Sequence, residues 1–177
     1  MPTRADQRDD FTRFVDTHLN YFLRIARGLT ADRDGADDLT QASLEKAYRS
    51  WGRVMQAVDP VGYVRRIMVN TCYDGWRRKQ RFRELFGMAD PNADLPPASW
   101  GDPASAFETH EGIDLLLEPL TARERAVVVL RHCADLSEAA TAAELGIPLG
   151  TVKSTSARAL SKLRGAHHLA GADHERP

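Results

Sequence analysis

The stretch SEAATAAELGIPLGTVKSTSARALSKLR, residues 137–164, has the pattern of two helices joined at a sharp corner. The first helix is short, rich in alanine, and ends at Gly146, where glycine is favoured because the chain enters a left-handed conformation. Small residues such as Ala142 allow close packing, and Ile147 and Val152 are spaced to fill the angle between the helices. The stretch therefore predicts a helix-turn-helix, a unit that commonly reads duplex DNA.

The second helix of this unit has an apolar face and a polar stripe. The apolar face consists of Val152, Ala159, Leu160 and Leu163, with Ser156 among them. The stripe lies roughly 130° away, at 100° per residue. It consists of Thr151, Ser154, Thr155, Arg158 and Lys162, with Lys153 on its flank. Hydroxyls and Arg158 suit base edges in a major groove, and the lysines suit phosphates.

A solvated polar face on an ordinary helical hairpin is the alternative. Residues 121–165 hold seven cationic and four acidic side chains, a balance of +3, which favours DNA binding. Upstream, Thr121 and Glu124 have the spacing of a capping box, and Ser137 is the expected N-cap of the short helix. The sequence thus predicts a second helical module over 107–165.

Helical periodicity also dominates the first 85 residues, without sustained alternation of period two. Apolar residues recur at helical spacing over 11–29 and again over 36–51. A third helix is predicted to begin at Asp59 and Pro60, an N-cap followed by proline at the first helical position, and to run toward Arg83.

The third helix of this first module is strongly basic. Residues 63–84 hold seven cationic and two acidic side chains, a balance of +5. The outward stripe of the helix consists of Arg66, Asn70, Tyr73 and Arg77, with Trp76 beside it. Aromatic rings between arginines suit melted DNA, because an exposed base stacks on a ring for roughly 1–3 kcal/mol. The alternative is a solvated charge run with aromatics that belong to the core.

The second helix has a different, partly acidic outward face. That face consists of Asp38, Gln41, Glu45 and Arg49, with Tyr48 alongside. Such a face is repelled by DNA and can dock on a basic protein helix, although a solvated face is the more frequent explanation of such a stripe.

Between the two modules the helical signal stops. Residues 87–105 contain four prolines, two glycines, three aspartates and no cation. The sequence therefore predicts an all-α chain of two small helical domains, 1–85 and 107–165, an extended acidic linker over 86–106, and a disordered tail over 166–177. The net charge of −1 hides this alternation of basic and acidic segments.

The composition narrows the class of protein. The 177 residues contain no apolar run near the roughly 20 residues that span a bilayer, and the start lacks a secretory signal. A cytoplasmic protein without membrane insertion is expected. Cys72 and Cys133 lie in helical patterns without zinc-type spacing, so we expect reduced structural thiols. We expect no metal, no cofactor, no small-molecule substrate and no catalytic residues.

Three stretches together resemble the extracytoplasmic-function (ECF) sigma factors of bacterial RNA polymerase, within the sigma-70 superfamily and closest to an actinobacterial-type branch. They are DRDGADDLTQASLEKAYRSW at 32–51, DPVGYVRRIMVNTCYDGWRRKQR at 59–81, and LTARERAVVVLRHCADLSEAATAAELGIPLGTVKSTSARALSKLR at 120–164. The order and spacing match that family over roughly residues 10–165.

The resemblance implies a region-2 domain that binds the polymerase core at the β′ clamp helices and β subunit and melts the −10 promoter element. It also implies a region-4 domain that reads the −35 element. The −10 strand would follow Tyr63, Arg66, Asn70, Tyr73, Trp76, Arg77 and Arg78. The loop over 52–59 would capture a flipped −10 base. The −35 element would meet Thr151, Lys153, Ser154, Thr155, Arg158 and Lys162. The core would dock on Asp38, Gln41, Glu45, Tyr48 and Arg49.

The chain departs from the family pattern at three positions. Thr155 stands where many relatives have arginine, Tyr63 where tryptophan is frequent, and Pro148 where serine is common. The linker either follows a basic channel of the polymerase or acts as a plain tether. An anti-sigma protein often controls such factors, and no residue of this chain declares one.

Two other functions remain as alternatives. A conventional helix-turn-helix regulator would carry an N-terminal sensing or dimerisation domain and bind duplex operators without polymerase. A helical enzyme acting on nucleic acid would need acidic residues that converge in a basic environment, whereas the acids here lie mainly in the linker and on the second helix. The sigma factor is therefore the favoured interpretation.

Overall fold

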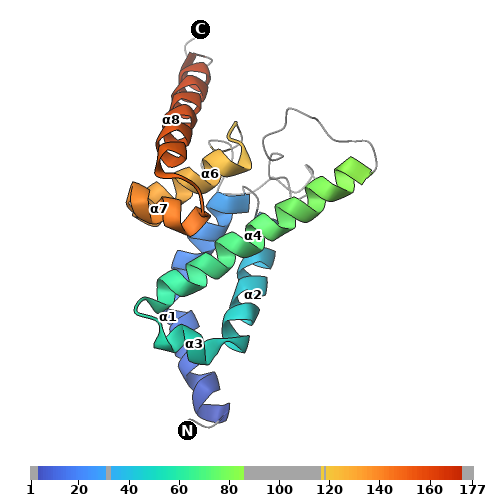
Figure 1. Cartoon of the computed structure of the whole chain (residues 1–177), viewed down its shortest axis with the longest axis vertical. Helices are drawn as coiled ribbons and strands as arrows, with labels where there is room; N and C mark the ends of the chain where they lie inside the picture. Colours follow the sequence, from blue (N-terminus) through green and yellow to red (C-terminus); the bar gives the residue numbers. More distant parts are fainter. Residues whose placement is uncertain (1–3, 31–32, 86–116, 118, 173–177) are drawn as a thin grey trace.

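The computed structural model describes residues 4–30, 33–85, 117 and 119–172, with side chains described over 5–30, 33–75, 117 and 119–165 (Figure 1). The elements in chain order are α1 (Arg4–Thr30), α2 (Arg33–Arg49), α3 (Trp51–Gln56), α4 (Pro60–Leu85), α6 (Ala122–Val128), the π-helix η2 (Val129–Cys133), α7 (Glu138–Leu145) and α8 (Leu149–Ala172). The described residues contain helices and turns and no strand, so the all-α prediction is confirmed.

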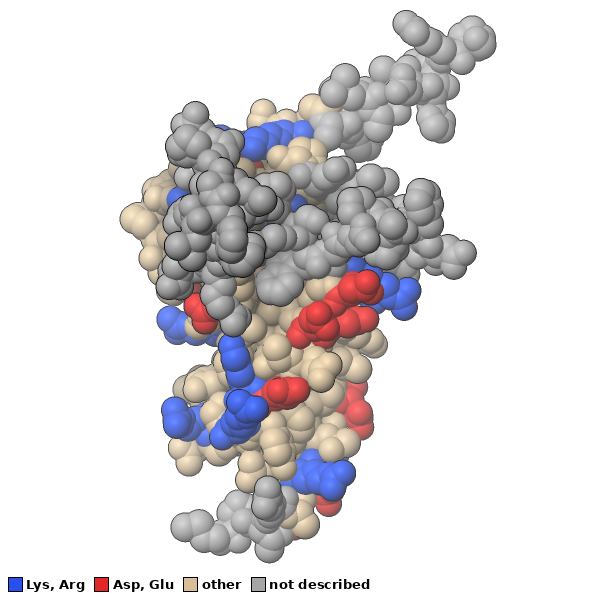
Figure 2. Space-filling view, turned by 90° about the vertical axis from the view of Figure 1, so that its right-hand side faces the viewer, with Lys and Arg blue, Asp and Glu red and all other residues tan. Residues whose placement is uncertain are grey.

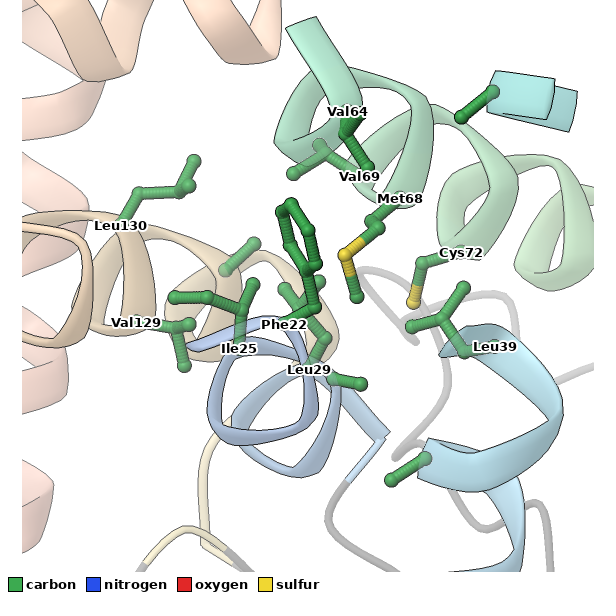
Figure 3. Packing of buried hydrophobic residues seen from close by; sticks show 14 of the residues in the cluster. Phe22, Ile25, Leu29, Leu39, Val64, Met68, Val69, Cys72, Val129 and Leu130 are labelled. Atoms are coloured by element: carbon green, nitrogen blue, oxygen red, sulfur yellow. The ribbon is translucent and has the colours of Figure 1, made fainter. Parts of the chain in front are cut away.

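The first module consists of α1 to α4. The long helix α1 packs along α2, and α4 crosses both (Figure 1). Figure 3 shows Phe22 and Leu29 of α1 facing Met68 of α4, with Leu39 of α2 closing one side of this core. The start of α4 follows the predicted signal, because the Asp59 carboxylate accepts a hydrogen bond from the Gly62 N–H at 2.9 Å.

The second module consists of α6, η2, α7 and α8, and its local signals form as the sequence predicts. The Thr121 hydroxyl and the Glu124 carboxylate each accept the other residue's backbone N–H, which completes the capping box of α6. The Ser137 hydroxyl accepts from the Ala140 N–H at the start of α7. Gly146 ends α7 with φ +64°, the left-handed conformation expected for the corner.

The two modules pack against each other in this structure. Ala122, Ala126, Val129 and Leu130 of the second module belong to the same buried cluster as the core of the first module. Figure 3 shows Val129 and Leu130 on the helix that lies beside Ile25 of α1. The chain therefore has one continuous core across α1, α4, α6 and η2.

Some segments differ from the expected boundaries. Trp51 begins the separate helix α3, so half of the predicted loop 52–59 is helical. Helix α8 continues to Ala172, past the boundary placed at residue 165, and α4 ends at Leu85. The predicted linker 86–106, the first residues of the predicted second domain and residues 173–177 lie outside the described residues.

Candidate nucleic-acid and protein interfaces

The exposed side of α4 carries polar residues of the predicted −10 stripe. Arg66 and Asn70 are exposed, and the opposite side of the helix is held by the buried Val64 and Met68. Asp74, which the sequence reasoning omitted, is also exposed on this side. The side chains of Trp76, Arg77 and Arg78 lie outside the described residues, although the helix continues through them.

The two tyrosines of the stripe are partly committed to the core. Tyr63 and Tyr73 are half-buried and pack against the buried cluster of the first module. Part of each ring is therefore in protein contact, and the predicted alternative of core aromatics applies to one side of each ring. The exposed groups beside α4 also include Met55 and the fully exposed Val58, which lie in the predicted base-capturing segment.

Helix α8 presents a wide exposed face in its described part. Its exposed residues through 162 are Leu149, Gly150, Lys153, Ser154, Ala157, Arg158, Ser161 and Lys162. Ser154 and Arg158, both predicted to meet DNA, lie on this face, while Thr151 is half-buried. Lys153 lies 4.0 Å from the Glu138 carboxylate, a contact between exposed side chains that leaves the ammonium accessible.

Thr155 lies elsewhere than the sequence stripe places it. Its residue is 1% exposed, and its hydroxyl has no hydrogen-bond partner in the described part of the chain. Helix α6 packs along α8 and covers this flank. Thr155 therefore cannot touch a base in this arrangement, and the exposed face is centred nearer Ala157 and Ser161, which the sequence reasoning missed.

Lys162 is bonded within the module. Its ammonium lies 2.7 Å from Oε2 of Glu124, whose side chain is 6% exposed. The same carboxylate accepts the Thr121 N–H at 2.9 Å. Burial raises the pKa of Glu124, but the hydrogen bonds from Lys162 and Thr121 outweigh burial and hold the pKa below its ordinary value. Lys162 thus fixes α8 on α6, a role that spacing alone did not reveal.

The predicted docking stripe lies on α2. Asp38, Gln41, Glu45 and Arg49 are exposed and Tyr48 is half-buried, with its ring 4.9 Å from that of Phe11. Gln41 donates to Glu45 at 3.4 Å. Figure 2, turned toward the side that carries α2, shows acidic side chains gathered at mid-height of this face.

A groove of about 430 Å³ runs between α1 and α2 beside this stripe. Its apolar lining includes Leu19, Leu23 and Leu44, and Asp37 lies at its edge. The Thr40 hydroxyl also lines it, is buried, and has no hydrogen-bond partner among the described residues. The sequence reasoning found the charged stripe and missed this groove, because the groove exists only where α1 meets α2.

The other groups show what the described ranges offer for cofactors and membranes. Cys72 is buried and Cys133 half-buried, and both are free thiols. Burial raises the pKa of each thiol. Within these ranges no cluster of three His, Cys, Asp or Glu side chains could hold a metal ion. No helix in the described part of the chain is both long enough and apolar enough to cross a bilayer.

Comparison with known families identifies two matching regions. The family model for sigma-70 region 2 matches residues 14–82, and that for sigma-70 region 4 matches residues 116–165. The chain is 38% identical over 158 residues to the RNA polymerase sigma-E factor of Streptomyces coelicolor, covering 88% of this chain and 84% of that protein. It is 32% identical over 159 residues to the ECF RNA polymerase sigma factor SigM of Mycobacterium tuberculosis, covering 90% and 78%.

Two solved structures share the fold. One is the sigma factor RpoE in complex with the anti-sigma factor NepR from Bartonella quintana, with a TM-score of 0.68, 24% identity, and coverage of 90% of this chain and 97% of that chain. The other is CnrH in complex with the cytosolic domain of CnrY, with a TM-score of 0.56, 20% identity and coverage of 96% and 91%.

Proposed function

The chain belongs to the ECF sigma factors of bacterial RNA polymerase, and from that premise we propose that α2, α4 and α8 divide its work into core docking, −10 melting and −35 reading. As a sigma factor it directs transcription initiation together with the polymerase core. The observation that carries the division of work is the chemistry of three separate exposed faces: acidic and apolar on α2, cationic on α4, and hydroxyl-rich with cations on α8.

Core docking is assigned to α2 and the groove beside it. The groove offers an apolar floor, acidic residues at its edge and the unpartnered hydroxyl of Thr40. A helix of the core with apolar and basic side chains matches that combination. Asp38, Gln41, Glu45, Tyr48 and Arg49 are the residues we assign to this contact.

The −10 element is assigned to α4. Arg66 and Asn70 are exposed on one side and can bond to the phosphates and bases of a melted strand. Tyr63 and Tyr73 keep one part of each ring accessible for a base. Trp76, Arg77 and Arg78 follow on the same helix and are proposed to extend this path.

The −35 element is assigned to α8, whose N-terminal half follows the left-handed corner at Gly146. Lys153, Ser154 and Arg158 are its exposed polar residues, and Thr151 lies at its edge. Ala157 and Ser161 present small groups that allow the helix to approach base edges closely. Thr155 and Lys162 are excluded from this set, because the first is buried and the second is bonded to Glu124.

An anti-sigma protein is a further proposed partner. The fold matches RpoE, whose structure contains the anti-sigma factor NepR, over 90% of this chain. A conventional regulator with an N-terminal sensing domain is not favoured, because the first module matches sigma-70 region 2 over residues 14–82.

Transcription with purified bacterial core polymerase tests the proposal. The pure protein should give promoter-dependent transcripts, and failure to associate with core would contradict the assignment. Arg66→Ala together with Asn70→Ala should reduce promoter opening, measured by permanganate reactivity of thymines, while core binding is unchanged. Arg49→Ala should instead weaken core binding. Equal effects of both changes on core binding would show that the faces are misassigned.

A further inference from the structure

The second module is held on the first by an apolar contact with little room for change. Gly28 of α1 lies against Val129, and a Cβ atom at Gly28 would come 2.5 Å from Val129 Cγ2. Val129 is fully buried, and valine has stiff rotamers, so it cannot easily move aside. The glycine therefore permits a close approach of η2 to α1 that any larger residue would prevent.

A buried ion pair joins the same two modules on the side of α4. Arg65 Nε of α4 lies 2.9 Å from Oε1 of Glu144 on α7, and both side chains are only 10% exposed. Arg65 also donates to Oε2 of Glu144 at 3.3 Å and to the Tyr21 hydroxyl at 3.1 Å. Burial lowers the pKa of Arg65, but its bonds to Glu144 and Tyr21 outweigh burial and raise the pKa overall.

Two further hydrogen bonds cross the interface to backbone carbonyls. Arg125 of α6 donates to Thr30 O at 3.2 Å, and Arg24 of α1 donates to Cys133 O at 3.5 Å. The contact of α6, η2 and α7 with α1 and α4, here called the module interface, therefore combines close packing with directional bonds. Such an interface defines one closed arrangement of the two modules.

The closed arrangement is too short for a two-element promoter. Elements at −10 and −35 lie about 25 base pairs apart, which is roughly 85 Å along straight B-DNA at about 3.4 Å per pair. In the closed protein α7 contacts α4 through Glu144 and also packs on α8. Only about two helix diameters, roughly 20–25 Å, separate α4 from the start of α8. One closed molecule cannot place both faces on the two elements of one duplex.

We propose that the module interface is autoinhibitory: in the free chain Glu144 and Val129 hold the second module on Arg65 and Gly28, and the modules must separate before both promoter elements are bound. This inference rests on the proposed function of α4 and α8. A fraction of nine-tenths in the closed form would weaken the apparent affinity for a two-element promoter about tenfold, because only the open fraction binds.

Two independent substitutions test the inference. Glu144→Gln keeps the shape of the side chain and removes the charge opposite Arg65, and Gly28→Ala introduces the methyl group that Val129 excludes while favouring the α1 helix. Both variants should show a larger radius of gyration by small-angle X-ray scattering. Both should also lower, by up to about tenfold, the concentration of the factor that gives half-maximal transcription at limiting core polymerase.

Each variant has a matched control on a similar element. Glu138→Gln removes a charge from the same helix α7 at a side chain that faces solvent and Lys153. Gly52→Ala adds a methyl group to α3, where no atom lies within 4 Å of the new Cβ. Neither control should alter the radius of gyration or the half-maximal concentration.

The outcomes separate this inference from the proposed function. Variants that open without any gain in transcription would overturn autoinhibition. Variants that keep the helical circular dichroism signal and remain as compact as the wild type would overturn the role of the interface residues. Wild-type protein that opens in the variants as expected but never supports transcription would contradict the proposed function instead.

Discussion

At the scale of single residues, Glu124 connects three parts of the second module. Its carboxylate accepts the Thr121 N–H, which caps α6, and the Lys162 ammonium, which holds α8. The side chain is 6% exposed, so a charge there is stabilised by these bonds and not by water. The orientation of the DNA-reading helix therefore depends on one buried carboxylate.

Glu124 should make stability depend on pH in a defined direction. Its folded pKa is below the unfolded value, so its contribution is fully present above about pH 4.3 and is lost as pH falls through the lower folded pKa. Glu124→Gln should lower the free energy of unfolding by about 1–3 kcal/mol at pH 7. The difference from wild type should shrink below about pH 4, as measured by urea unfolding between pH 3 and 7. The exposed Glu138→Gln is the control, and a difference that does not change with pH would contradict the role of the charge.

Thr155 offers a test of which residues face DNA. Thr155→Val replaces a buried hydroxyl that has no partner in the described part of the chain with a methyl group of similar size. The free energy of unfolding should stay the same or rise by up to about 1 kcal/mol, and −35 preference should not change. Arg158→Ala on the exposed face should weaken −35 binding in parallel assays on sets of promoter variants. A changed base preference in Thr155→Val would mean that this residue reaches DNA.

At the scale of elements, the corner between α7 and α8 is set by backbone conformation. Gly146 has φ +64°, and its N–H bonds to Ala142 O. No atom lies within 4 Å of a Cβ placed there, so a larger residue meets conformational strain and no steric clash. The direction of α8 therefore follows from one left-handed residue.

Gly146→Ala should destabilise the second module through strain alone. The expected loss is about 1–2 kcal/mol, since a non-glycine residue in the left-handed region costs about that much. Thermal unfolding should then occur about 2–8 °C lower for a chain of this size. Gly150→Ala is the matched control, because Gly150 lies inside α8 with open space around it and alanine favours a helix. Equal midpoints for the two variants would contradict the strain at Gly146.

At the scale of the whole molecule, the two modules stabilise each other. Ile25 and Leu29 of the first module are fully buried, and their cluster includes Val129 and Leu130 of the second. Neither module has all of its packing partners within its own residues. The matched family regions therefore divide the chain by sequence, while the core extends across both.

A fragment of residues 1–85 should be less stable than the intact chain. Fully burying a side chain such as Ile25 or Leu29 contributes about 1.5–3 kcal/mol, and part of that burial comes from the second module. The expected loss is about 2–4 kcal/mol in urea unfolding, accompanied by binding of a hydrophobic dye to the exposed α1 surface. A fragment that unfolds at the same urea concentration as the full chain, without dye binding, would contradict a shared core.

The sequence alone predicted the helices, their caps and the corner of the DNA-reading unit. Thr121, Ser137 and Gly146 act through hydrogen bonds and backbone angles within a few residues, so their signals are local and readable. The basic side of α4 was also readable, because Arg66 and Asn70 lie opposite a clear apolar stripe.

The tertiary structure decided which ambiguous residues face outward. Thr155, Tyr73 and Lys162 each combine apolar and polar parts, so spacing assigns them an angle but not an environment. Helix α6 covers one flank of α8, and this buries Thr155 and bonds Lys162. The pair of Arg65 and Glu144 lies 79 residues apart in sequence, and only the packing of α7 on α4 brings their charges together, because no local pattern encodes a contact between distant helices.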